Sequence, residues 1–184
     1  IKNIKSISAP QFSPNEKYIA YISSGKNKYK SNSQLWLINL KTARKSQLTK
    51  TQNDVTDFQW SPDGEKIAIV VHHKKVDIKG TKPPIVVDRY QFKKDGYDFI
   101  ESENQHIHIM YLDKRSSTQI TKGNYDHVVP SWSPDGKKLA FSSKRENPDK
   151  HNNWDIYIKD IQKDSTTKLT EHDGADSDPY SVSR

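Results

Sequence analysis

The sequence contains no cysteine, one methionine and only seven glycines among 184 residues. The absence of cysteine excludes disulfides and thiolate chemistry, and it suits a reducing compartment, so we expect a cytoplasmic protein. No apolar run approaches the roughly 20 residues that span a bilayer, so we expect no membrane partner. The Gly-x-Ser-x-Gly motif of a nucleophile elbow is also absent, and we assign no catalytic residue to this chain.

The charge is basic, with 30 Lys and Arg against 23 Asp and Glu and a formal net charge of +7. The lysines are spread through the expected loops, and no basic helix or stacking-aromatic motif accompanies them. We therefore interpret them as solvated surface and expect no nucleic-acid partner. The chain begins at Ile1 and its one methionine is Met110, which indicates a piece of a longer protein.

A five-residue motif, Trp-Ser-Pro-Asp-Gly, occurs at residues 132–136 and again at residues 60–64. Each copy is followed by an alternating run of strand-forming residues. A third copy, Phe-Ser-Pro-Asn-Glu, stands at residues 12–16. Ser, Pro, Asp and Gly are the residues that a type I turn prefers at its successive positions. Each copy therefore predicts a strand, a tight turn and a second strand, with the turn at residues 12–16 the least ideal.

A second signature follows each turn: Leu48-Thr49, Ile120-Thr121 and Leu169-Thr170. Thr49 precedes Trp60 by 11 residues, and Thr121 precedes Trp132 by the same number. This constancy indicates a repeat of about 48 residues and four strands, with about 24 extra residues in the second unit. Repeats of this length and strand content are typical of WD-like and related β-propeller blades.

The sequence thus predicts an all-β fold, a partial β-propeller of about three blades with four antiparallel strands each. Blade one covers residues 8–50 and blade two residues 54–122, with an inserted hairpin at about 75–100. Blade three covers residues 125–172, and a fourth blade begins at 173–184. Trp60 and Trp132 are expected to fill the layers between blades. We expect no helix.

Two patterns suggest a metal site, but neither meets the requirements. His106 and His108 lie on one face of a predicted strand without a third ligand at a recognisable spacing, and we interpret them as edge-strand surface residues. The acidic loop at residues 173–178 lacks the ligand spacing and terminal Glu of an EF-hand. We expect no metal and no cofactor.

The repeats resemble those of TolB-like propellers. The segment Arg-Tyr-Gln-Phe-Lys-Lys-Asp-Gly-Tyr at residues 89–97 resembles an insertion in the N-terminal propeller of acylaminoacyl peptidases and related dipeptidyl peptidases of the prolyl oligopeptidase family. That resemblance implies a substrate-gating propeller of a serine peptidase that hydrolyses short or N-acylated peptides. It also implies a following α/β-hydrolase domain with a Ser-Asp-His triad. Arg89 and Tyr90 are the candidates for substrate contact, although an ion pair within the blade would equally explain Arg89.

The expected partners are therefore the chain's own C-terminal α/β-hydrolase domain and short peptide substrates. The alternative is a non-enzymatic TolB-like propeller that serves as a protein-binding scaffold. In both cases an incomplete ring leaves two sheet faces without a neighbouring blade, so we expect the 184-residue chain to self-associate.

Overall fold

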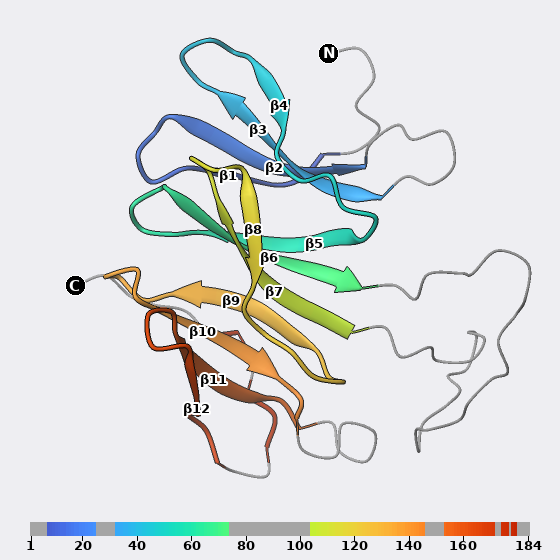
Figure 1. Cartoon of the computed structure of the whole chain (residues 1–184), viewed down its shortest axis with the longest axis vertical. Coiled ribbons are helices and arrows are strands. Elements are labelled where there is room, and N and C mark those ends of the chain that lie inside the picture. The colour runs from blue at the N-terminus through green and yellow to red at the C-terminus, as the bar shows by residue number, and fades with distance from the viewer. Residues whose placement is uncertain are drawn as a thin grey trace, which may run out of the picture.

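The structure of the chain is a computed structural model, which describes residues 7–24, 32–73, 104–145, 153–171, 174–176 and 178–179. These residues form three four-stranded antiparallel sheets and no helix (Figure 1). The first sheet contains β1 (Ser8–Phe12), β2 (Tyr18–Ser24), β3 (Ser33–Asn39) and β4 (Lys45–Gln47). The second contains β5 (Asp54–Trp60), β6 (Lys66–His73), β7 (Asn104–Tyr111) and β8 (Ser116–Gln119). The third contains β9 (His127–Trp132), β10 (Lys138–Ser143), β11 (Asp155–Asp160) and β12 (Ser165–Lys168).

Within every sheet the spatial order of the strands follows their order in the chain. This is an up-and-down arrangement, because consecutive strands pair antiparallel and are joined without a crossover. The three sheets are stacked one after another along the long axis of the molecule (Figure 1). The architecture is that of consecutive propeller blades, which confirms the predicted fold class. The inserted hairpin predicted at about 75–100 lies outside the described residues.

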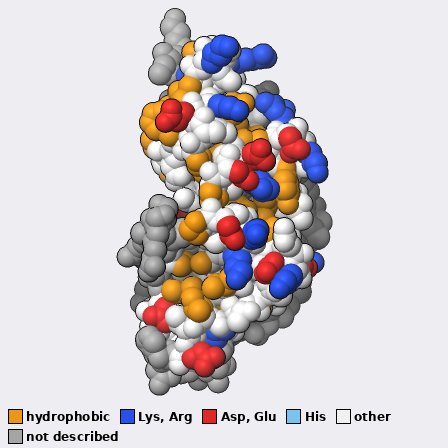
Figure 2. All heavy atoms as spheres, turned by 90° about the vertical axis from the view of Figure 1, so that its left-hand side faces the viewer, with side chains coloured by type: hydrophobic (Ala, Val, Ile, Leu, Met, Phe, Trp, Pro, Cys, Tyr) orange, Lys and Arg blue, Asp and Glu red, His pale blue; other side chains and the backbone are white. Residues whose placement is uncertain are grey.

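The turns between the first two strands of the three sheets lie on the same side of the molecule, facing the viewer in Figure 2. Basic and acidic side chains are interspersed over most of that face. In each turn a backbone N–H donates to the carbonyl of the serine three residues earlier. The distances are 2.9 Å from Glu16 to Ser13, 2.9 Å from Gly64 to Ser61 and 2.8 Å from Gly136 to Ser133.

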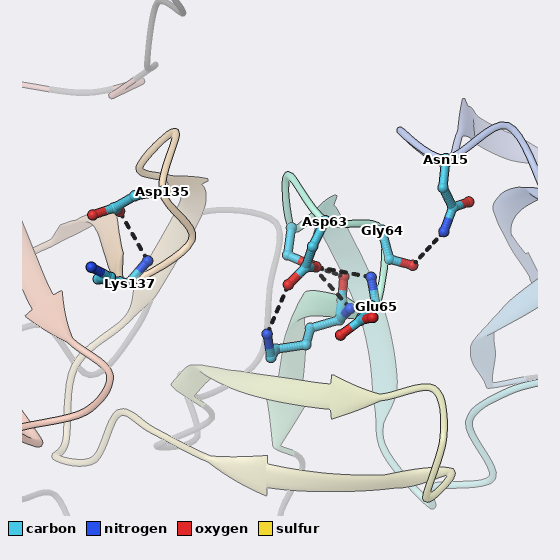
Figure 3. Close-up of polar contacts among 8 residues, drawn as sticks. Asn15, Asp63, Gly64, Glu65, Asp135 and Lys137 are labelled. Carbon is cyan, nitrogen blue, oxygen red and sulfur yellow. Dashed lines mark hydrogen bonds and ion pairs between the residues drawn. The ribbon is translucent and has the colours of Figure 1, made fainter.

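The turn residues also bond among themselves through side chains (Figure 3). The Ser61 hydroxyl donates to Asp63 at 2.5 Å, and Lys66 Nζ lies 3.0 Å from the same carboxylate. These contacts lower the pKa of Asp63 despite the opposing effect of burial. Neighbouring turns meet as well, since the Asn15 amide donates to the Gly64 carbonyl at 3.3 Å. The local turn chemistry therefore also joins the first blade to the second.

Threonines of the second signature cap the third strand of each sheet. Thr49 Oγ1 accepts the backbone N–H of Leu35 at 2.9 Å. Thr121 and Thr170 accept in the same way from Ile107 at 2.8 Å and from Ile156 at 3.0 Å, respectively. Thr49 and Thr121 are buried, and a buried N–H without an acceptor is costly. The repeated threonine is thus a structural part of the blade.

Two apolar layers separate the three sheets. The layer between the first and second sheets contains Trp60, and the layer between the second and third contains Trp132. These two indoles are 4% and 3% exposed, and the Trp132 N–H donates to the Gln59 carbonyl at 3.2 Å. The prediction that Trp60 and Trp132 both fill layers between blades is confirmed. Phe12 holds the same repeat position but is 68% exposed on the first sheet.

A residue with positive φ precedes a proline in the first strand of two sheets, β1 and β9. Ala9 has φ 50° before Pro10, and Val129 has φ 51° before Pro130. Both lie at register irregularities, where β1 pairs with β2 and β9 with β10. Asp178, which precedes a further proline, also has positive φ, at 57°. The backbone at Asp178 thus has the same left-handed φ that precedes the prolines of β1 and β9.

Candidate functional site

The strand ends opposite the Ser-Pro turns gather side chains from the second and third sheets. β6 ends at His73, opposite Asn104, where β7 begins. β10 ends at Ser143, opposite His127, where β9 begins. Because antiparallel neighbours reverse direction, all four of these termini lie on the side away from the turns (Figure 1).

Four imidazole rings form a row along these strand ends, which we call the histidine row. The ring centroids are 5.4 Å apart for His108 and His73, 5.3 Å for His73 and His106, and 5.3 Å for His106 and His127. Three of the rings belong to the second sheet, and His127 belongs to the third. The row therefore crosses the boundary between two blades.

His73 and His108 are joined end to end. Their Nε2 atoms are 3.1 Å apart, and the ring planes differ by only 18°. The centroids are 5.4 Å apart, so both nitrogens lie between the rings and point at each other. One Nε2 carries the proton and the other accepts it, since two protonated nitrogens cannot bond. This is the geometry of a hydrogen bond rather than of two ligands that converge on one metal ion.

Burial is the first cause that lowers the pKa of every ring in the row. It brings the pKa of His127 to about 3, with a further lowering from the Arg145 guanidinium, and the pKa of His108 to about 4. The pKa values of His73 and His106 are lowered in the same direction. All four rings are therefore neutral at pH 7.

Arg145 is the cation at the end of the row. Its Cζ lies 4.1 Å from the ring centroid of Tyr157, 5.5 Å from that of Tyr125 and 5.8 Å from that of Phe141. Phe141 and Tyr157 are themselves stacked, with centroids 5.9 Å apart and planes 18° apart. Tyr125 and Phe141 also contact the His127 ring edge-on, at 5.1 and 5.5 Å. One guanidinium is thus held among aromatic rings beside a neutral imidazole.

Three buried nitrogens at this site have no hydrogen-bond partner among the described residues: Nδ1 of His106, Nδ1 of His127 and Nε of Arg145. The His127 Nε2 lies 3.2 Å from the Lys122 carbonyl, so that nitrogen is the donor and Nδ1 has the free lone pair. The site therefore combines a cationic donor with an unsatisfied acceptor. Such a combination is suited to holding a polar or anionic group rather than to nucleophilic chemistry.

The sequence-predicted site residues have different outcomes. Arg89 and Tyr90 lie outside the described residues, so their substrate contact stays a prediction. The interpretation of His106 and His108 as edge-strand surface residues was wrong, because β7 lies between β6 and β8 and the His106 side chain is buried. Among the described residues no group of three or more His, Cys, Asp or Glu side chains could hold a metal ion.

Arg145 and His127 were missed by sequence reasoning, although the sequence contains a signal for each. Arg145 stands four residues after Phe141 and therefore on the same side of an extended strand. The aromatic partner became evident only from the register that pairs Phe141 with Tyr157. His127 lies just before the Val-Val-Pro segment at residues 128–130 of β9, and from the sequence alone this position is interpreted as an ordinary loop residue.

No helix in the described part of the chain is long and apolar enough to cross a membrane.

Comparisons with known proteins agree on this architecture. The chain is 27% identical over 158 residues to the uncharacterized peptidase YuxL of Bacillus subtilis, which covers 81% of the chain and 24% of that protein. It is 31% identical over 96 residues to dipeptidyl-peptidase 5 of Porphyromonas gingivalis, covering 51% of the chain and 11% of that protein. The chain therefore spans about a quarter or less of the length of these relatives.

Solved structures with the same fold include an acylaminoacyl peptidase and a TolB protein. An acylaminoacyl peptidase of Pyrococcus horikoshii superposes with a TM-score of 0.63 at 20% identity, over 91% of this chain and 25% of that one. TolB of Acinetobacter baumannii superposes with a TM-score of 0.60 at 20% identity, over 95% of this chain and 35% of that one. At this level of identity the likeness establishes the propeller-like fold.

The family model that matches the chain is described as the dipeptidyl peptidase IV N-terminal region, and it covers residues 81–184. These residues include β7 to β12 and the Arg145 site. Together with the three stacked sheets and the peptidase relatives, this match shows that the chain belongs to the dipeptidyl peptidase IV N-terminal region family.

Proposed function

We propose that this chain is the non-catalytic, substrate-gating part of a cytoplasmic serine peptidase that hydrolyses short or N-acylated peptides. The observation that carries the proposal is the stack of three propeller blades in a chain that matches the peptidase family over residues 81–184. Catalysis then belongs to an α/β-hydrolase domain outside these 184 residues, since the sequence has no Gly-x-Ser-x-Gly motif.

The gating role follows from the physics of a ring of blades. Close-packed apolar layers lie between neighbouring sheets, so a solute would pass around the blades or through the proposed ring rather than between them. An extended peptide fits a narrow opening that excludes a folded protein. The propeller thereby selects substrates by size before any chemistry occurs.

A second candidate function is a non-enzymatic, TolB-like scaffold that binds another protein. The observation in its favour is the 33% identity over 72 residues to the Tol-Pal system protein TolB of Hahella chejuensis. That match covers 39% of the chain, against 81% for YuxL. We therefore place the peptidase first.

The proposed partners are the hydrolase domain of the same protein and short peptides, with neither nucleic acid nor membrane. The turn-bearing face supports the exclusion of nucleic acid, because acidic side chains are interspersed among the basic ones there (Figure 2). A duplex-binding surface would instead concentrate one sign of charge.

A serine-directed fluorophosphonate probe tests the assignment of catalysis. The 184-residue chain is expected to remain unlabelled and to leave an N-acetylated tripeptide anilide intact. The full-length protein is expected to be labelled at a single serine beyond residue 184 and to cleave the anilide. A full-length protein that neither reacts nor hydrolyses would favour the scaffold function, and labelling of the isolated chain would contradict the proposal.

A further inference from the structure

We propose that Arg145 is a carboxylate-binding residue that anchors short peptides on the propeller. This inference rests on the proposed function, because it takes the ligand to be a peptide. The chemistry recognised is the carboxylate itself, which comes either from the peptide C-terminus or from an acidic side chain of the peptide.

The first support is the way the guanidinium is held. Its closest ring is Tyr157, with Cζ 4.1 Å from the centroid, and the Phe141 ring lies under the same cation at 5.8 Å. Both rings are almost fully buried, so the floor under the cation is rigid. A guanidinium that stacks on a ring with its flat face keeps its N–H donors in its own plane, where they can bind another group.

The second support is that Asp126 and Asp155, described acids near this edge, each contact another group, although the buried Oδ1 of Asp155 has no hydrogen-bond partner among the described residues. The Asp126 carboxylate accepts the backbone N–H of Gln105 at 2.8 Å. Asp155 forms an ion pair with Lys168 at 3.1 Å. Among the described residues no carboxylate pairs with Arg145, whose buried Nε has no hydrogen-bond partner. The guanidinium is thus a partly desolvated cation without a counter-ion among the described residues.

The third support is electrostatic. The imidazole of His127, which the Arg145 charge influences, is kept neutral, because burial and that charge lower its pKa to about 3. The site therefore presents one positive charge at neutral pH, next to an uncharged acceptor. A planar carboxylate can accept two parallel N–H bonds from a guanidinium, whereas a carboxamide offers one uncharged carbonyl oxygen and so gives a weaker interaction.

Arg145 also lies on the side of the propeller that suits this role. It follows the last residue of β10, on the edge away from the Ser-Pro turns. The aromatic contact to Tyr125 and the histidine row connect it to the end of β6. A peptide bound there would lie at the outer end of the apolar layer between the second and third sheets.

The test is calorimetric titration of the full chain with three peptides that differ in whether, and where, they carry a carboxylate. These are N-acetyl-trialanine with a free carboxylate, the same peptide as its C-terminal amide, and N-acetyl-Ala-Glu-Ala amide. We expect the free-carboxylate peptide to bind about ten-fold more tightly than the amide, which is the usual gain of a charge-assisted pair. Recovery of that gain by the glutamate peptide assigns the site to carboxylates in general, and its absence assigns it to the C-terminus.

Three variants make the test specific. Arg145→Gln is expected to remove the preference for the carboxylate, and Arg145→Lys to keep only part of it because lysine binds as a point charge. Lys144→Gln, which removes the same charge one residue away, is expected to leave the preference unchanged. Unfolding curves verify that all three variants are folded.

Equal binding of the carboxylate and amide peptides, or an equal loss in Lys144→Gln, would overturn the inference. So would the absence of any binding by the wild-type chain. None of these outcomes affects the fluorophosphonate result, so failure of the Arg145 site and failure of the peptidase assignment are distinguishable.

Discussion

At the scale of single residues, burial decides how much the aromatic residue at one position of the repeat contributes to stability. Trp60 and Trp132 fill the layers between sheets, while Phe12, their counterpart in the first unit, is largely exposed. The sequence alone shows three equivalent aromatics. The difference among them depends on whether a neighbouring sheet packs on that side, which no local pattern encodes.

Replacing Trp132 by alanine is expected to destabilise the chain by about 3–5 kcal/mol, because it removes a buried indole and its hydrogen bond to Gln59. Replacing Phe12 by alanine at the matching position is expected to cost less than about 0.5 kcal/mol. Urea unfolding of the two variants measures both values. Similar losses in the two would refute the distinction between filled and unfilled layers.

The histidine row predicts a loss of stability in mild acid. Because the folded-state pKa values of His127 and His108 are about 3 and about 4, the unfolded chain binds more protons once the pH falls below about 6.5. Stability should therefore decline steadily from pH 6.5 toward pH 4, by at most about 1.4 kcal/mol per pH unit for each ring. The melting temperature across this range measures the decline.

Substitution separates this effect from that of the acidic residues. His127→Gln keeps a donor for the Lys122 carbonyl but cannot titrate, so its decline between pH 6.5 and 4 should be shallower than that of the wild type. Asp135 has a lowered pKa, and its contribution is lost only below about pH 3.8. Asp135→Asn should thus leave the upper range unchanged. A wild-type chain with flat stability from pH 6.5 to 4 would contradict the assignment.

At the scale of elements, the turn is the unit that sequence predicts best. The Ser-Pro turns form where their residues require, and the turn at residues 12–16 is the least ideal, as predicted. It places Glu16 at φ 54°, where the other two turns have Gly64 at φ 67° and Gly136 at φ 66°. A side chain in this left-handed region costs about 1–2 kcal/mol.

Glycine substitutions in the turns should rank in a definite order. Glu16→Gly is expected to stabilise the chain by up to about 1 kcal/mol, because relief of the left-handed strain exceeds the added chain entropy. Gly136→Ala should destabilise through φ alone, since the nearest atom to its new Cβ is Pro62 Cδ at 3.8 Å. Gly64→Ala should cost more, because that Cβ would meet Asn15 Nδ2 at 2.7 Å.

Thermal unfolding of the three single variants checks this order. Equal losses in Gly64→Ala and Gly136→Ala would show that the contact between neighbouring turns contributes nothing. A destabilising Glu16→Gly would show that the first turn is not strained.

The strand ends were far less predictable than the turns. Turns follow from four consecutive residues, whereas the site joins residues that are distant in the chain. His73 and His108 meet across β6 and β7, and Arg145 meets Tyr157 through the register of β10 and β11. Register depends on the pairing of whole strands, so these contacts could not be read from spacing.

At the scale of the whole molecule, three sheets form two sealed layers and leave the outermost faces of the stack without a described neighbour. Large apolar side chains are exposed there, with Phe12 at 68% and Leu40 at 40% on the first sheet and Leu169 at 59% on the third. Exposed apolar β-surface of this kind promotes association.

The isolated 184-residue chain is therefore expected to self-associate. Light scattering should report a mass that rises with concentration, and Phe12→Ser should weaken the association without lowering the melting temperature. A monomer of 21.2 kDa at high concentration would contradict this expectation.

The proposed function requires these blades to admit peptides by size to a catalytic domain. The most direct test measures kcat/KM of the full-length protein on acylated peptides of increasing length that share one cleavage site. We predict a steep fall as the substrate outgrows the ring opening, and no cleavage of a folded protein that contains the same site. Cleavage of the folded protein as fast as the shortest peptide would contradict the account.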